Sequence, residues 1–331
     1  PTAPAADPPA EGSVKNPTTN VINVVNNWVG KAAKELKIRL SNVNIKAENA
    51  GQKAAMDVSG GGKTKVELDG QNVLDSYSVL YQAGLRKQGE GTLTITDETD
   101  DNGNKITAPK SGDSGSLTAK GATSNGSAGI GGKTGESTKN IIIEGYATVD
   151  ATGGGQGAGI GGGGGTAGHV SGDAENIIIR GHSNVTATSC DGAAIGGGSS
   201  FSHHSSGSAT GIWIYGHATV NASTSGNGAA IGAADGNRYA EAEVTIGTDG
   251  ATAEQEDVHV TATSKDGAAI GNGNANTKVI IQGHTTIENA FSKYGTAIGG
   301  NYYANDSGDM SITIRDLSLI HISEPTRLDV I

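Results

Sequence analysis

Short segments in which apolar and polar residues alternate cover most of the chain between residues 20 and 316. Each has the length of a strand and ends near glycine, asparagine or aspartate, as in KIRLSNVNIKA, TKVELDG and GTLTITD. Alternation with a period of two places one face of a strand against a core and the other in solvent. The pattern therefore predicts an all-β protein built from many short strands.

A glycine-rich string recurs along the second half of the chain and gives these strands a larger order. The copies GSAGIGG, QGAGIGG, DGAAIGG, NGAAIGA, DGAAIGN and YGTAIGG share an isoleucine, at Ile130, Ile160, Ile195, Ile231, Ile270 and Ile298. A second pattern lies between them, I-I-I-x-G followed by x-V-x-A, as in NIIIEGYATVDAT. Each copy thus supplies three strands that can stack on those of the next copy about 4.8 Å away. The sequence predicts a right-handed parallel β-helix, or solenoid, of roughly nine coils.

The richest glycine string, GQGAGIGGGGG, contains a literal G-x-G-x-x-G at Gly157, Gly159 and Gly162. A dinucleotide-binding loop requires a helix directly after these glycines, but the sequence continues as TAGHVSGDAEN. The string also recurs in every copy, which a single nucleotide site does not require. We interpret the glycines as corner residues, where the backbone bends sharply or approaches the adjacent coil.

Composition divides the chain into four parts. Residues 1–19 hold five of the seven prolines and predict an extended linker. Residues 20–115 predict the first coils, with a surface excursion at 97–105, and residues 116–316 predict the glycine-rich coils. Residues 317–331 are interpreted as an artefact, because LSLIHISEPTR resembles the translation of an adapter used to build sequencing libraries. That resemblance implies a metagenomic or transcriptome origin and a natural protein that continues further.

Charge and cysteine content narrow the classes of function. The net charge is −11 and no basic run is longer than two residues, so nucleic-acid binding is not expected. The single cysteine, Cys190, excludes a disulfide framework within the chain and a cysteine-based metal cluster. No apolar run is long enough to span a bilayer, so membrane insertion is not expected either.

The repeat resembles the glycine-rich repeats, of the form G-G-x-V-x-A-x-G-G-x-x-G-A-G-I-G-G-G, in large surface proteins of Gram-positive gut bacteria. It is also similar to β-helical carbohydrate-binding domains of the pectate-lyase-like superfold, and the resemblance covers about residues 20–316. The resemblance implies a non-catalytic, adhesin-like protein at the cell surface, outside the cell. Its expected partners are polysaccharide or glycoprotein glycans, and it would form part of a longer surface protein. The chain departs from the family at the second glycine after I-x-I-x-G, where it has Tyr146, His182, His217, Thr248 and His284.

Segments of unequal length follow each A-I-G string and leave the same corner of the predicted solenoid. Variable loops on one face of a solenoid are a common place for binding. These loops hold aromatic side chains among asparagine, aspartate and serine, a combination that suits sugar recognition. The expected glycan-binding residues are Phe201, His203, His204, Tyr239, Tyr302 and Tyr303.

Two segments raise the question of a metal ion. His182 and His217 would lie roughly 5 Å apart on neighbouring coils, and His203 or His204 could complete a site for a divalent cation. The interpretation that the sequence favours is an exposed ring ladder, because no carboxylate is obliged to complete the site. The excursion DETDDNGNK is similar to a calcium loop, but its glycine lies one position late for an EF-hand. No cofactor is expected, and calcium is left open.

Two other columns of residues suggest alternative functions. Asp191 and Asp266 occupy the same repeat position two coils apart, roughly 9–10 Å, at the outer limit of the carboxylate separation in inverting glycosidases. A polysaccharide lyase or hydrolase of the same fold is therefore the first alternative, although Asp-Gly is also an ordinary turn dipeptide. Outward threonines such as Thr148 and Thr219 form an array like that of ice-binding solenoids, which is the second alternative. The expectation remains that the protein is not an enzyme.

Overall fold

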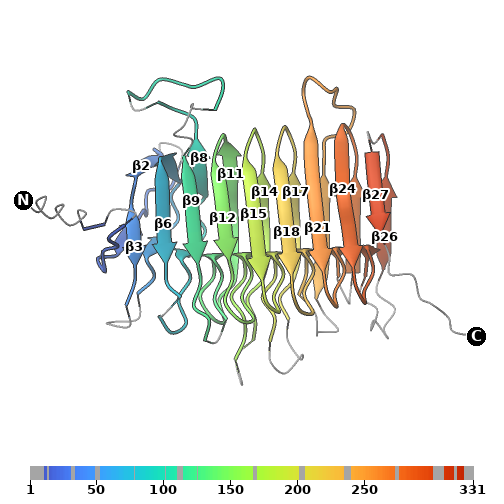
Figure 1. Cartoon of the computed structure of the whole chain (residues 1–331), viewed down its shortest axis with the longest axis horizontal. Helices are drawn as coiled ribbons and strands as arrows, with labels where there is room; N and C mark the ends of the chain where they lie inside the picture. The colour runs from blue at the N-terminus through green and yellow to red at the C-terminus, as the bar shows by residue number, and fades with distance from the viewer. Residues whose placement is uncertain are drawn as a thin grey trace, which may run out of the picture.

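The computed structural model arranges the chain as an elongated stack of coils, with the N-terminal coils at one end and the C-terminal coils at the other (Figure 1). The structure describes residues 11–12, 15–30, 34–48, 53–77, 79–100, 102–109, 115–124, 126–166, 170–200, 206–234, 240–272, 276–300, 309–316 and, for the backbone, 319–323. In these residues, no helix is long and apolar enough to cross a membrane.

Three parallel sheets run along the stack, and each coil contributes one strand to each sheet. The first sheet consists of β1 (Ile22–Val25), β4 (Met56–Ser59), β7 (Leu85–Lys87), β10 (Ile130–Gly131), β13 (Ile160–Gly161), β16 (Ile195–Gly196), β19 (Ile231–Gly232), β22 (Ile270–Gly271) and β25 (Ile298–Gly299). The second sheet consists of β2 (Leu36–Ser41), β5 (Thr64–Asp69), β8 (Leu93–Asp97), β11 (Thr138–Gly145), β14 (Ala174–Ile179), β17 (Ala209–Ile214), β20 (Glu241–Ile246), β23 (Asn276–Ile281) and β26 (Met310–Ile314). The third sheet consists of β3 (Asn44–Lys46), β6 (Gln71–Asp75), β9 (Ser116–Lys120), β12 (Thr148–Thr152), β15 (Asn184–Ser189), β18 (Thr219–Thr224), β21 (Val258–Ser264), β24 (Thr285–Ser292) and β27 (Leu319–Ser323).

The order of strands confirms the predicted fold class. Neighbours in each sheet are three strands apart in the sequence and pair in parallel, as β13 does with β16 and β16 with β19. Such pairing arises when a chain winds repeatedly through the same three directions. The protein is therefore an all-β, three-sheet parallel β-helix of about nine coils.

The core is a set of columns of small and β-branched side chains that run along the stack. Ile160 pairs with Ile195 and Ile195 with Ile231 in the first sheet, and all three are completely buried. In the third sheet, Val185 pairs with Val220 in the same way. Each residue is thus covered by its counterparts on the coils before and after it, which confirms the predicted ladders.

The glycine after each of these isoleucines is required by the close approach of the next coil. Gly161 has a φ of +141° and Gly196 a φ of +142°, values that residues with a side chain rarely adopt. A Cβ on Gly161 would overlap the carbonyl oxygen of Gly196, and one on Gly196 would overlap that of Gly232. The glycine string is therefore part of the coil-to-coil contact, as the sequence predicts, and the G-x-G-x-x-G is no nucleotide fingerprint.

The connections between strands differ at the two edges of the stack that Figure 1 shows. The first sheet and its connections lie along the lower edge. At the upper edge the second sheet passes directly into the third through tight corners, except after β8 and between β20 and β21, where longer segments project. The excursion after β8 stands beside the corners of β11 and β14, and this position creates the candidate site.

Candidate ligand-binding site

Three rings stack along the corner between the second and third sheets. The ring centroids of Tyr146 and His182 are 4.9 Å apart with planes at 25°, and those of His182 and His217 are 4.6 Å apart with planes at 14°. The backbone N–H of His182 donates to the carbonyl of Gly145 at 2.8 Å, and that of His217 to Gly181 at 2.7 Å. The coil-to-coil hydrogen bonds therefore set the spacing of the rings.

This stacking bears on the predicted metal ligands His182 and His217. The lone pair of an imidazole nitrogen lies in the ring plane, so two nearly parallel rings direct their lone pairs side by side. The geometry favours the ring ladder over a shared ion. Partial burial lowers the pKa of His182, and the nearby His217 lowers it further, which favours the neutral form of the His182 ring. The suggested third ligands, His203 and His204, lie outside the described residues.

The other members of the predicted column lie apart from this stack. Thr248 follows the corner of β20, and His284 beyond it has its Nδ1 3.4 Å from the carboxylate of Asp257. Within the described part of the chain, no group of three or more histidine, cysteine, aspartate or glutamate side chains is placed to hold a metal ion. The ladder thus consists of three rings on three successive coils.

A row of charged and hydroxyl groups runs beside the ring ladder on the outer face of the second sheet. Arg180 donates from Nε and Nη2 to the carboxylate of Glu144 at 2.8 and 2.5 Å, and from Nη1 to the Tyr215 hydroxyl at 3.0 Å. Lys65 approaches the same Glu144 at 3.5 Å and Glu98 at 2.8 Å. The row is a chain of charge-assisted contacts that holds the Arg180 guanidinium in place.

The excursion after β8 turns this corner into a pocket of about 500 Å³. The ring ladder lines it with Tyr146 and His182, the charged row lines it with Glu144 and Arg180, and Glu98 and Lys105 belong to the excursion. The pocket combines ring surfaces with both signs of charge. It can therefore contact an apolar patch and several hydroxyl groups of one ligand.

Hydrogen bonds at its base fix the excursion over the corner. The Glu67 carboxylate accepts bonds from the backbone N–H groups of Glu98 and Thr99 at 2.9 and 2.7 Å. Arg39 donates to the Thr99 hydroxyl at 2.7 Å and to the carbonyl of Asp100 at 3.1 Å. The wall of the pocket is therefore tied to the underlying strands β2 and β5.

The turn at the tip of the excursion bears on the calcium question. Asp100 Oδ1 accepts bonds from the backbone N–H groups of Asn102 and Asn104 at 3.0 and 2.7 Å, and Asp100 Oδ2 accepts one from the Asn104 amide at 3.0 Å. The carboxylate thus already closes the turn as an Asx-type cap. Asp101 lies outside the described residues, and calcium binding here stays untested.

Strand β17 and the corner that follows it add large aromatic side chains to the same face. Trp213 points outward between the buried Ile212 and Ile214, and 43% of its surface is exposed. It pairs in register with Ile178, so an apolar column lies beside the Arg180 row. The sequence GIWIYGH thus presents Trp213, Tyr215 and His217 at every second position. Of these three, only His217 was among the residues predicted from the sequence, and alternation along this segment could have added Trp213 and Tyr215.

The structure describes the residues of the predicted aspartate column but not those predicted from the loops. Phe201, His203, His204, Tyr239, Tyr302 and Tyr303 lie outside the described residues, so their part in binding stays a prediction. The backbone N–H of Asp266 donates to the carbonyl of Gly226 at 3.1 Å, which aligns Asp266 with Asn227 on the preceding coil. The Asp266 carboxylate is 3.1 Å from Lys265.

Comparison of the chain with models of protein families, with curated proteins and with solved structures gives no match. The assignment of function therefore depends on the chemistry of the sites themselves.

Proposed function

We propose that this protein is a non-catalytic, extracellular surface protein of adhesin type that binds glycans at the corner pocket of the second sheet. The observation that carries the proposal is the pocket itself, where the rings of Tyr146 and His182 stand beside the Glu144–Arg180 pair. Trp213 extends the aromatic surface along the same face.

The two kinds of group in the pocket match the two kinds of surface on a sugar. The face of Tyr146 that does not stack on His182 can cover an apolar C–H patch of a pyranose, while a guanidinium and carboxylates bind its hydroxyl groups. Because coil-to-coil hydrogen bonds hold the corners that carry Tyr146, Arg180 and His182, these groups lose little conformational freedom when a ligand binds. The surface is therefore suited to binding one or two sugar units without rearrangement.

The surroundings of the carboxylates support binding rather than chemistry. Lys65 approaches both Glu98 and Glu144, and Arg180 holds Glu144 by two further hydrogen bonds. Both carboxylates are thus already paired with basic side chains, whereas a glycosidase needs two carboxyl groups free to act on the glycosidic bond. Polysaccharides would accordingly be bound at this pocket and released unchanged.

Binding to plant, mucin and microbial polysaccharides tests this proposal. Tyr146→Ala and Arg180→Ala should each weaken binding of the best ligand roughly tenfold, about 1.4 kcal/mol. Tyr294→Ala is the matched control, because Tyr294 is 58% exposed and lies outside the pocket. Wild-type affinity in both pocket variants would exclude this pocket and leave the predicted loop residues as the binding surface. Absence of binding to any glycan would overturn the proposal.

An enzyme of the same fold is the alternative that the aspartate column suggests. It predicts that polysaccharide incubated with the protein releases new reducing ends or unsaturated products. Asp191→Ala and Asp266→Ala would abolish that release, whereas Tyr146→Ala would not. Release that depends on these aspartates would replace the binding proposal by catalysis.

The outer face of the third sheet is the basis of the second alternative, which is ice binding. Thr148, Asn184 and Thr219 pair in register, and so do Thr152, Thr188 and Ser223, which gives two straight columns of short polar side chains. Such an array could order water at an ice surface. Faceting of ice crystals by the protein at low temperature would favour this function, and crystals that grow unshaped would exclude it.

A further inference from the structure

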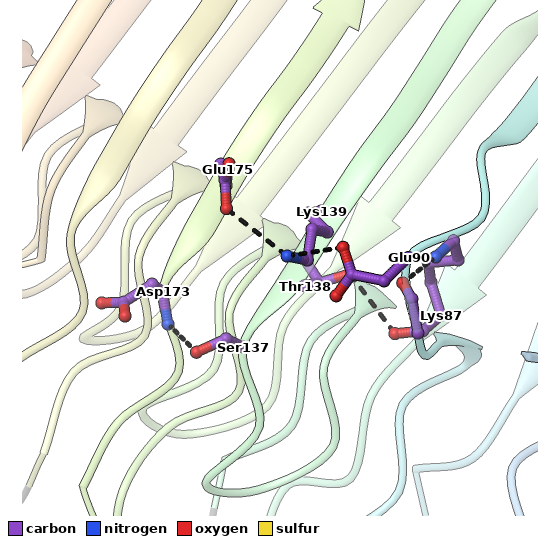
Figure 2. Close-up of a pocket in the computed structure, with 8 residues that line it drawn as sticks. Lys87, Glu90, Ser137, Thr138, Lys139, Asp173 and Glu175 are labelled. Carbon is purple, nitrogen blue, oxygen red and sulfur yellow. Dashed lines mark hydrogen bonds and ion pairs between the residues drawn. The ribbon is translucent and has the colours of Figure 1, made fainter. Parts of the chain in front are cut away.

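A second pocket lies where strands β11 and β14 begin, at the opposite end of these strands from the ring ladder (Figure 2). Its volume is about 290 Å³, and Lys87, Glu90, Lys139, Asp173 and Glu175 line it. Figure 2 shows Lys139 between Glu90 and Glu175, at 2.9 and 3.8 Å from their carboxylates. Lys87 lies beside this group, but its amine donates to backbone carbonyls.

Lys87 stands at a position that belongs to the apolar core. It pairs with Val58, and Val58 pairs with Val24, so a lysine continues a column of valines. Only 2% of its surface is exposed. A buried amine costs free energy unless it is well paired, and the fold gains nothing here that a third valine would not supply. A lysine in a buried column of valines departs from the rule that core positions are apolar, and such departures indicate functional positions.

The hydrogen bonds of the Lys87 amine fit its neutral form. Nζ donates to the carbonyls of Gln88 at 3.2 Å and Gly89 at 2.8 Å, and no carboxylate in the described part of the chain pairs with it. A neutral amine has two N–H groups and one lone pair, whereas an ammonium has three N–H groups. Two carbonyl partners therefore satisfy the neutral amine and leave its lone pair free.

Burial also favours the neutral form of the Lys87 amine. It lowers the pKa of Lys87 to about 8, while Glu90 opposes the shift and Lys139 adds to it. At pH 7.5 about a quarter of such amines are neutral, compared with about one in a thousand for a lysine with an unperturbed pKa. Lys87 is thus a nucleophile at a pH where lysines with an ordinary pKa are protonated.

We propose that Lys87 is a reactive amine that captures small, neutral aldehydes in this pocket. The nitrogen lone pair attacks the carbonyl carbon while the π electrons move to oxygen. Protons then pass from nitrogen to that oxygen, water leaves, and an imine joins Nζ to the former carbonyl carbon. One amine and one aldehyde give one imine and one water, without oxidant or reductant. This inference does not rest on the proposed glycan binding.

The rim of the pocket sets the charge of the ligand. Glu90, Asp173 and Glu175 carry three negative charges against one positive charge on Lys139, so an anionic aldehyde meets repulsion. Glycolaldehyde should therefore react faster than glyoxylate, although both are small. Glu90→Gln, which removes one rim charge, should narrow the difference between the two probes.

Reductive trapping tests the proposal on the intact protein. The wild type is incubated with glycolaldehyde and cyanoborohydride at pH 7.5, and modified peptides are quantified by mass spectrometry. Lys87 should be labelled at least tenfold faster than the exposed Lys278. Lys65, a partly buried lysine on the outer face of β5, is the control with a raised pKa: burial opposes the rise, but Glu98 and Glu144 outweigh it, and this lysine should stay unlabelled. Labelling of exposed lysines with Lys87 untouched would overturn the proposal.

Two further measurements distinguish a reactive amine from an adventitious one. The rate of Lys87 labelling should rise with pH and level off above about pH 8. Labelling of Lys265, whose pKa is raised by its hydrogen bond to Asp266, should keep rising to much higher pH. Lys87→Met should remove this labelled peptide and leave the others, and its circular dichroism shows whether the fold is kept. A Lys87 profile parallel to that of Lys265 would contradict the inference.

Discussion

Gly196 lies where two coils approach each other too closely for any side chain. Its φ is +142°, and a methyl group added at its Cα would overlap the carbonyl oxygen of Gly232. The neighbouring coils cannot separate there without breaking the hydrogen bonds of the first sheet. Conformational strain and steric overlap would therefore act together on any substitution at this residue.

We expect Gly196→Ala to lower the free energy of unfolding by more than about 3 kcal/mol, because both effects oppose the substitution. Gly250→Ala is the matched control, since Gly250 has a φ of +70° but nothing within 4 Å of its Cβ position. Strain alone should cost about 1 kcal/mol there. Denaturation followed by circular dichroism gives both values, and equal losses would show that overlap between coils contributes little.

His259 shows how single residues tie neighbouring coils by charge. Its Nδ1 is 2.8 Å from Glu288 on β24 and its Nε2 is 3.3 Å from Asp257. The hydrogen bond to Glu288 raises the pKa of His259, burial opposes the rise, and Asp257 adds to it. The protonated imidazole is therefore favoured in the folded protein.

A group whose pKa is raised by folding stabilises the protein fully below its unfolded pKa, about 6.5 here, and loses this effect as pH rises through the folded value. His259→Gln should therefore cost more stability at pH 6 than at pH 9. The difference should be below about 1 kcal/mol, because the side chain is partly exposed. His182→Gln should show the opposite pH dependence, since the pKa of His182 is lowered. A pH-independent effect of His259→Gln would contradict the assignment.

At the scale of an element, strand β11 separates neighbouring isoleucines onto opposite faces. Ile141 and Ile143 are completely buried in the core, while Ile142 between them faces outward and is half-buried. The I-I-I run alone does not reveal which residues point inward. The register with Ile177 and Ile179 on β14 gives the same answer on the next coil.

Ile143→Ala and Ile142→Ala form a matched pair on one strand. The first should cost about 2–5 kcal/mol, because it removes buried surface and leaves a cavity between two coils. The second should cost less than about 1.5 kcal/mol, because its side chain covers only the outer face. Urea denaturation of the two variants measures both. A larger loss for Ile142→Ala would reverse the assigned faces.

Repeat register explains which parts of the site could be predicted from the sequence. Ile160, Ile195 and Ile231 occupy one repeat position, so aligning the copies places them in one column. Glu144 and Arg180 also share a position, the x of I-I-I-x-G, so their ion pair was open to the same reasoning. The pocket could not be predicted by aligning the copies, because it depends on how the excursion from Glu98 onward folds over a corner. No local pattern specifies that path.

The whole molecule is a linear array in which each strand pairs only with its counterparts on the coils before and after it. Ile231 and Ile270 hold equivalent places on successive coils. Removal of the chain between them should let the coil of Ile195 stack directly on that of Ile270. Both pockets lie outside this part of the stack.

Deletion of residues 231–269 should therefore give a shorter solenoid with a β-type circular dichroism spectrum and a cooperative thermal transition. Deletion of residues 231–250 is the control, because it removes strands of two sheets but keeps the third-sheet strand of the same coil. That variant cannot keep all three sheets in register and should fail to fold. Equal behaviour of the two deletions would show that whole coils are not the unit of stability.

The parallel pairing of all three sheets also determines how the molecule would respond to mechanical force. Hydrogen bonds between coils point along the axis of the stack, so tension applied between its two ends pulls on them lengthwise. The terminal coil has a neighbour on one side only and is held by the fewest bonds. A stretched molecule would therefore unwind from an end, one turn at a time, and each step would lengthen the tether by the contour of a single turn.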